Sequence, residues 1–232
     1  MKQHTLFCIP YAGGNKNIFS PLESFIDSYI SIKPLELPGH GTRFSEPLLT
    51  SIEDMAEDIV EQIIQHNEKV FSILGYSMGS VILYEVYFKL KEYGFNIPQN
   101  IIICSKDPIG YYNEFDNIAE MGNETFKNFI RKKGATHEEI LSNDELWEII
   151  SPILKADFIA IDNYKNFIKS ERFHSSLYIF LGEKDNINNE NLYKWSLFST
   201  QNTKYKIFNG GHFFLFNNYK EISDELNSIC KP

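Results

Sequence analysis

The chain has 232 residues, a hydrophobic content of 43% and a formal net charge of -9. This length and apolar content suit one compact domain that spans residues 1–232. The negative charge argues against nucleic acid as a partner, because duplex binding requires a dense field of Lys and Arg side chains. The longest apolar runs are of strand length, far below the ~20 residues that cross a bilayer. We find no signal-peptide pattern at the N-terminus, and we therefore expect a soluble, cytoplasmic protein without membrane association.

Six short apolar runs, each closed by Gly, Pro or Asn, predict β-strands. They cover residues 6–9, 30–37, 70–74, 101–104, 177–181 and 205–208. Several are apolar at consecutive positions, which is typical of strands that are buried on both faces of a parallel sheet. Helices are predicted between them at 51–66, with Thr50 or Ser51 as the N-cap, at 78–93 and at 217–229. This alternation indicates an α/β fold with a mostly parallel central sheet flanked by helices.

Residues 113–169 interrupt the alternation and carry no convincing strand. Helical periodicity, separated by turn signals, is found at 124–133, 144–154 and 158–167. We expect this segment, called the helical insertion below, to form a lid over the strand ends. Its apolar side chains either shape a pocket or are simply the packing faces of three helices: Met121, Phe126, Phe129, Ile130, Leu146, Trp147, Ile150, Leu154 and Phe158.

The three cysteines, Cys8, Cys104 and Cys230, are widely spaced, and two of them lie inside apolar runs. We interpret them as buried thiols, since Cys behaves as a small hydrophobe in such a setting. A zinc site would need a paired spacing such as C-x-x-C with nearby His, and the sequence has none. We expect no metal and no other cofactor.

The pentapeptide 75–79, G-Y-S-M-G, directly follows the predicted strand 70–74 and opens a predicted helix. A G-x-S-x-G sequence in this context predicts the tight strand-to-helix turn that presents a nucleophilic serine, here Ser77. Gly75 and Gly79 fit this turn because larger residues would make the backbones collide. The start of the following helix also favours negative charge that develops near the serine.

A serine hydroxyl is a poor nucleophile at its own pKa and needs a base, which follows the serine along the chain in this type of fold. His212 satisfies that order, since it stands in the segment 209–212, N-G-G-H, just after the predicted strand 205–208. The alternative is an exposed loop histidine. His40 precedes the serine, and the other histidines lie at termini or in helical or linker positions.

Two aspartates obey the order serine, acid, histidine. Asp185 ends the strand before His212, and Asp107 ends the strand before that one. We prefer Asp185, because Asp107 precedes Pro108 and suits an ordinary turn. The acid would hold the imidazole in the correct tautomer and stabilise the imidazolium without taking the proton.

An oxyanion hole is expected from two backbone N–H groups, that of Met78 after the nucleophile and one from the loop after an early strand. The segment 10–14, P-Y-A-G-G, is that loop, and we assign the second donor to Ala12. The alternative is a plain turn or a phosphate-binding loop, but the segment lacks the Lys-Ser/Thr ending of a P-loop and the third glycine of a dinucleotide fingerprint.

With these motifs in place, the chain resembles the type II thioesterases that accompany nonribosomal peptide and polyketide synthases, a family of α/β-hydrolases. Segment 7–14 is similar to that family's opening F-x-x-P-[HY]-A-G-G, and segment 37–43 is similar to its L-P-G-R-x-x-R. The resemblance continues along almost the whole chain, at 75–79, 134–136, 138–139, 144–146, 152, 155–158, 181–185 and 210–213. His40 departs from the family, which usually has Arg there, and segment 105–108 departs from its usual S-G-R-x-P.

This resemblance implies a serine hydrolase that removes acyl groups from the phosphopantetheine thiol of acyl or peptidyl carrier proteins, with Asp185 as the acid. It also implies a monomer. Because carrier proteins are commonly acidic, docking to a chain of negative charge would need a local basic patch. Candidates on the helical insertion are Lys127, Arg131, Lys132 and Lys133, which otherwise form a solvated helix face. The alternative function is a free-standing esterase or fatty-acyl thioesterase that acts on small esters or acyl-CoA.

Overall fold

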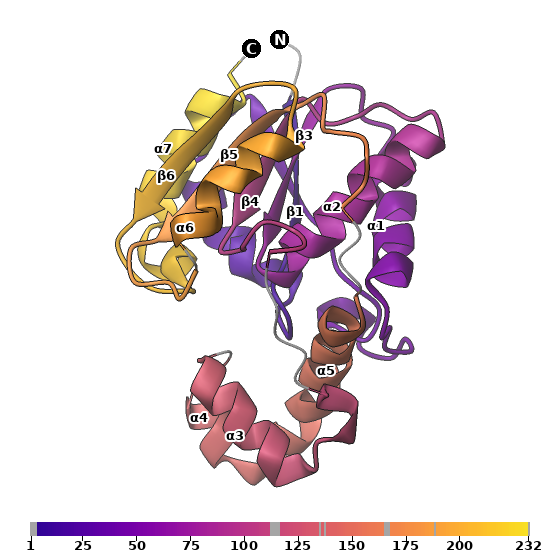
Figure 1. Cartoon of the computed structure of the whole chain (residues 1–232), viewed down its shortest axis with the longest axis vertical. Coiled ribbons are helices and arrows are strands. Elements are labelled where there is room, and N and C mark those ends of the chain that lie inside the picture. The colour runs from indigo at the N-terminus through magenta and orange to yellow at the C-terminus, as the bar shows by residue number, and fades with distance from the viewer. Residues whose placement is uncertain are drawn as a thin grey trace.

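The computed structural model describes residues 4–111, 117–134, 136, 138–164, 168–187 and 189–231. Its centre is a six-stranded parallel sheet with the strand order β2-β1-β3-β4-β5-β6 (Figure 1). The strands are β1 (His4–Ile9), β2 (Ile30–Pro34), β3 (Phe71–Tyr76), β4 (Asn100–Cys104), β5 (Ser176–Gly182) and β6 (Thr203–Phe208). All six predicted strands are confirmed, although β2 ends three residues before the predicted end at 37.

The sheet lies between two layers of helices. Figure 1 shows α1 (Ile52–His66) and α2 (Met78–Glu92) on one side of it and α7 (Tyr219–Ile229) on the other. Ser51 is the N-cap of α1, as predicted, and its hydroxyl accepts a hydrogen bond from the N–H of Asp54 at 3.3 Å. Shorter helical turns complete the layers: η1 (Lys16–Ser24), η2 (Gly41–Arg43), α6 (Asn189–Leu192), η4 (Tyr193–Phe198) and η5 (Phe214–Asn217).

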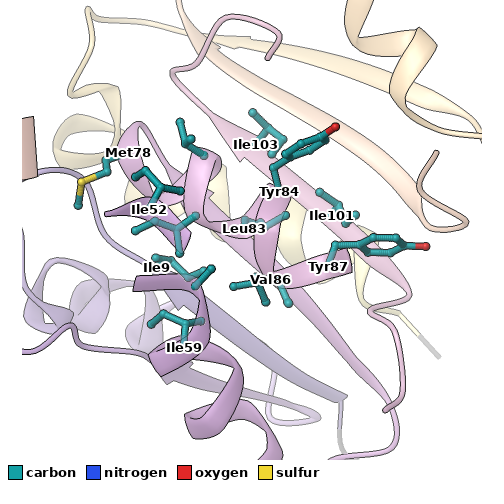
Figure 2. Close-up of a cluster of buried hydrophobic side chains, with 14 of the residues drawn as sticks. Ile9, Ile52, Ile59, Met78, Leu83, Tyr84, Val86, Tyr87, Ile101 and Ile103 are labelled. Atoms are coloured by element: carbon teal, nitrogen blue, oxygen red, sulfur yellow. The ribbon is translucent and has the colours of Figure 1, made fainter. Parts of the chain in front are cut away.

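Apolar side chains fill both faces of the sheet. Figure 2 shows the larger cluster, in which Ile9 and Ile103 of the sheet pack beside Ile59 of α1 and Leu83 of α2. A second cluster covers the opposite face and includes Leu226 of α7. Every residue of β1, β3 and β4 is buried, which is why these strands are apolar at consecutive positions. The three cysteines are free and buried, as predicted.

The helical insertion contains η3 (Ile118–Glu120), α3 (Asn123–Lys133), α4 (Glu138–Ser142) and α5 (Asp144–Asn163). In Figure 1 it lies at the end of the molecule opposite both termini. Its apolar residues form a cluster of their own, in which Phe126, Ile130 and Trp147 are buried. These side chains are therefore packing faces of the helices. Among the described residues, no helix has the length and apolar character required to span a membrane.

The prediction of two helices at 144–154 and 158–167 was wrong, because α5 runs as one helix of 20 residues through Pro152. The intervening residues 155–157 have no helix breaker. The polar side chain of Asp157 faces the main domain, where it binds the Gly13 N–H and His40. The predicted end at 167 and the predicted start of the insertion at 113 lie outside the described residues.

Candidate active site

The carboxyl ends of the strands bring the candidate residues to one edge of the sheet. Parallel pairing sets Ile9 opposite Gly75, Tyr76 opposite Cys104, and Gly182 opposite Phe208. The segments that leave these strands carry the 10–14 loop, the serine turn and the loops of the acid and the histidine. Ligand sites of open parallel sheets form at this edge.

The turn from β3 into α2 is as tight as the G-x-S-x-G pattern predicts. Ser77 has φ 51° and ψ -109°, a conformation that is uncommon for any residue other than glycine. A Cβ atom on Gly75 would collide with the carbonyl oxygen of Gly79, and one on Gly79 would collide with the carbonyl oxygens of Ile9 and Pro10. The two glycines therefore let the turn, the helix and the end of β1 pack in direct backbone contact.

His212 lies between Ser77 and Asp185. Its Nε2 is 3.0 Å from Ser77 Oγ, and its Nδ1 is 3.1 Å from Asp185 Oδ1. Since a carboxylate only accepts hydrogen bonds, Nδ1 carries the proton and Nε2 is free to accept the one from the serine hydroxyl. The Asp185 side chain is only 4% exposed, whereas that of His212 is 34% exposed. The carboxylate is therefore shielded from solvent, whereas the imidazole is partly exposed.

Backbone contacts join the loop of the acid to the loop of the histidine. The N–H groups of Glu183 and Lys184 donate to the carbonyl oxygens of Phe208 and Gly210, both at 2.8 Å. A Cβ atom on Gly182 would collide with the carbonyl oxygen of Gly211. The orientation of Asp185 toward His212 is thus fixed by the main chain of both loops.

Two further residues hold the backbone of His212, and sequence analysis missed both. The Tyr76 hydroxyl and the Ser105 hydroxyl donate to the His212 carbonyl oxygen at 2.6 Å and 2.9 Å. Tyr76 occupies a variable position of the serine motif, so only its place at the end of β3 could have suggested it. Ser105 precedes Asp107 in the loop after β4, and it is Asp185 that contacts the histidine ring.

The 10–14 loop is ordered by two of its N–H groups. The N–H of Gly14 donates to the Tyr11 carbonyl oxygen at 2.9 Å, and the N–H of Gly13 donates to Asp157 Oδ2 at 2.6 Å. The N–H of Ala12 forms no hydrogen bond with the residues that the structure describes. Ala12 therefore keeps an available donor beside the serine turn, which the Gly79 contact with Ile9 and Pro10 brings close.

His40 and Asp157 form a buried pair that sequence analysis did not identify. His40 Nε2 is 3.0 Å from Asp157 Oδ2, and the two side chains are 3% and 0% exposed. Burial lowers the pKa of the His40 imidazole, but the hydrogen bond and the charge of Asp157 outweigh this effect, so the pKa lies above its usual value. The two residues lie 117 positions apart, in segments 37–43 and 155–158, and nothing in the sequence of either segment indicates that they pair.

The loop of His40 is fastened by Arg43. Its guanidinium binds both carboxylate oxygens of Asp58, at 2.7 Å and 2.8 Å, and both oxygens of Glu46, at 2.8 Å and 2.6 Å. It also donates to the carbonyl oxygen of Glu36 at 2.8 Å. Arg43 therefore has a structural role, since its donors are engaged by the protein itself.

The basic residues of α3 are partly neutralised. Lys127 pairs with Asp144 at 3.2 Å, and Arg131 pairs with Glu138 at 3.0 Å. Lys133 lies over the ring of Phe129. Carboxylates therefore engage two of the four candidate cations, Lys127 and Arg131.

A parallel sheet with a strained serine at the turn after a central strand, a buried carboxylate in the loop after β5 and a histidine in the loop after β6 defines a hydrolase of the α/β-hydrolase fold. A family model described as "Thioesterase domain" matches residues 4–230. The chain therefore belongs to the thioesterase domain family.

The chain is also similar to individual proteins whose names give a pathway. The chain is 27% identical over 227 residues to the gramicidin S biosynthesis protein GrsT of Aneurinibacillus migulanus, covering 97% of this chain and 87% of that protein. It is 26% identical over 216 residues to the human medium-chain S-acyl fatty acid synthase thioesterase, covering 90% of this chain and 80% of that protein. The crystal structure of ClbQ, from the colibactin NRPS/PKS pathway, matches with a TM-score of 0.92 and 26% identity over 98% of this chain and 96% of ClbQ.

Proposed function

We propose that this protein is a type II thioesterase that hydrolyses acyl groups from the phosphopantetheine thiol of acyl or peptidyl carrier proteins in nonribosomal peptide or polyketide biosynthesis. The observation that carries the proposal is the hydrogen-bonded row Ser77, His212 and Asp185 in a chain of the thioesterase domain family. The pathway context comes from the similarity to GrsT and ClbQ and from the motifs shared with type II thioesterases.

The first half of the reaction forms an acyl-enzyme. Ser77 Oγ attacks the thioester carbonyl while His212 Nε2 takes its proton, and Asp185 stabilises the resulting imidazolium. The tetrahedral intermediate then expels the carrier thiol, which receives the proton from His212. The acyl group remains on Ser77.

The negative charge that develops on the carbonyl oxygen of the intermediate requires two hydrogen-bond donors. The N–H of Met78, in the first turn of α2, and the N–H of Ala12 are the groups that we assign to this oxyanion hole. The assignment of Ala12 is supported by the engagement of the neighbouring Gly13 and Gly14 N–H groups elsewhere. A second cycle, with water activated by His212, releases the free acid.

A second candidate is a free-standing fatty-acyl thioesterase or small-ester hydrolase. The similarity to the human fatty acid synthase thioesterase favours it. The same three residues would perform the same chemistry, so the two functions differ only in which acyl donor binds. Because Lys127 and Arg131 of α3 are paired with carboxylates, carrier docking through these two residues would require their ion pairs to rearrange.

The deciding experiment compares acyl release from a panel of acyl-phosphopantetheinyl carrier proteins with release from the matching acyl-CoAs and p-nitrophenyl esters. We expect the highest kcat/KM on the carriers, loss of all three activities in Ser77→Ala, and no change in Ser196→Ala, which removes an exposed hydroxyl elsewhere. Faster turnover of free esters, without preference for a carrier, would favour the second candidate.

A further inference from the structure

The helical insertion reaches the main domain through one face of α5. Leu154 and Asp157 are one turn apart on this helix and both meet Gly13. Gly13 has φ 75°, and a Cβ atom on it would collide with the Leu154 side chain. The N–H of Gly13 donates to Asp157 Oδ2 at 2.6 Å. The 10–14 loop therefore contacts the insertion in two ways. The Leu154 side chain packs against Gly13, and Asp157 accepts a charge-assisted hydrogen bond from the Gly13 N–H.

Asp157 is held by a second donor, and the protons can be assigned. His40 Nδ1 is 3.0 Å from the carbonyl oxygen of Pro38, so Nδ1 must carry a proton. His40 Nε2 faces Asp157 Oδ2 at 3.0 Å, and this contact is attractive only if a proton lies between the two atoms. A proton on either group would satisfy this contact, and the raised pKa of His40 favours its position on the imidazole; both side chains are buried. Asp157 Oδ1 accepts no hydrogen bond from the described residues, so both donors converge on Oδ2.

These contacts fix the peptide groups on both sides of Ala12. The Tyr11 carbonyl, which shares a rigid peptide plane with the Ala12 N–H, is held by the N–H of Gly14. The following peptide is held through Gly13 by Asp157. With both neighbouring planes anchored, the direction of the Ala12 N–H is determined.

We propose that Asp157, held in place by His40, is a positioning residue that aims the Ala12 N–H of the 10–14 loop at the reacting carbonyl and thereby couples the helical insertion to catalysis. This inference rests on the proposed function, because it assumes that Ala12 is an oxyanion donor. Asp157 acts through the loop and does not touch the substrate. If the Ala12 N–H points away from the oxyanion, the transition state is less stabilised, whereas substrate binding in the ground state changes little.

The test is steady-state hydrolysis of a p-nitrophenyl acyl ester, which needs no carrier, by wild type, Asp157→Ala, Asp157→Asn and Glu85→Gln. Loss of one oxyanion donor lowers kcat by about 10²-fold to 10³-fold. For Asp157→Ala we expect a fall in kcat of about 10²-fold with KM changed by less than about twofold, because the hole is misaligned and not removed. Asp157→Asn keeps an oxygen that accepts from Gly13, so we expect it to restore most of the loss and to stay about fivefold below wild type.

Glu85→Gln is the matched control. Glu85 is buried on α2 and ties the end of α5 to the main domain, since it accepts from the Tyr164 hydroxyl at 2.5 Å and pairs with Lys169 at 2.8 Å. It does not contact the 10–14 loop. Its loss should lower the midpoint of thermal unfolding while kcat stays at the wild-type value.

The outcomes separate the two proposals. A wild type that hydrolyses neither ester nor carrier thioester would contradict the proposed function. A folded Asp157→Ala with the kcat of Glu85→Gln, or a fall in kcat that follows thermal stability across all variants, would overturn the positioning role. If Asp157→Ala does not fold, Asp157→Asn decides alone, and a kcat equal to that of Glu85→Gln would overturn the inference.

Discussion

The strand-end edge of the sheet and the helix α5 contribute to the same site in different ways. At the edge, short turns with required glycines place Ser77, Asp185 and His212 within hydrogen-bonding distance. On α5, Asp157 reaches the site only because a helix of the insertion docks against the 10–14 loop. The first arrangement combines tight local turns with the pairing of strands in the sheet, whereas the second depends on packing of the helical insertion against the main domain. The three reacting side chains are therefore positioned by the sheet and its loops, whereas the 10–14 loop is also held by a residue of the helical insertion.

The largest effects are expected when the nucleophile or the base at the strand-end edge of the sheet is removed. We expect Ser77→Ala and His212→Ala each to lower kcat for thioester hydrolysis by about 10⁴-fold or more, because nucleophile and base act as one unit. His174→Ala, which changes an exposed histidine, is the control and should retain full activity. The measurement is the rate of thiol release from an acylated carrier. Residual activity above one hundredth of wild type in either variant would contradict the assignment.

The next prediction separates the two candidate acids. Asp185→Asn should lower kcat by about 10³-fold to 10⁴-fold, because an amide favours the wrong imidazole tautomer. Asp107→Asn should stay within about fivefold of wild type, since the histidine ring contacts Asp185. The same thiol-release assay measures both variants. Equal loss in the two would show that the acid is not assigned correctly.

The close packing at the edge can be tested by adding one methyl group. Gly79→Ala would force a Cβ atom against the carbonyl oxygens of Ile9 and Pro10, and we expect it to lower the free energy of unfolding by about 3 kcal/mol. Gly122→Ala is the control, because its Cβ would meet open space at a negative φ, and its cost should stay below about 1 kcal/mol. Urea unfolding compares the two. A smaller loss for Gly79→Ala than for Gly122→Ala would contradict the packing described here.

The smallest expected effect concerns pH and the buried pair. Because Asp157 raises the pKa of His40 above its ordinary value, the pair contributes its full stability below that ordinary value, and the contribution is lost as pH rises through the raised pKa. Glu36 also raises the pKa of His40 through its charge. Urea unfolding between pH 6 and pH 9 measures this contribution. The free energy of unfolding of wild type should exceed that of His40→Gln by the largest amount near pH 6. A gap that widens with rising pH would contradict the charge assignment.

The sequence predicted the elements whose signals are local. The six strands, the Ser51 cap and the serine turn all follow from apolar runs, capping residues and glycine spacing. The division of α5 into two helices was wrong because periodicity alone does not show whether a helix continues across a polar residue such as Asp157. The support of His212 by Tyr76 and Ser105 could not be predicted either. It depends on which strands become neighbours, and the side chains themselves have no distinctive motif.

The proposed function requires that a carrier-bound thioester acylates Ser77. The most direct measurement is the intact mass of the enzyme, quenched during turnover of an acyl-phosphopantetheinyl carrier protein, followed by mapping of the modified peptide. We expect a mass increase equal to the acyl group on the peptide that contains Ser77, and none in Ser77→Ala. Turnover with no covalent adduct at any quench time, or an adduct on another residue, would contradict the role of Ser77 as the nucleophile.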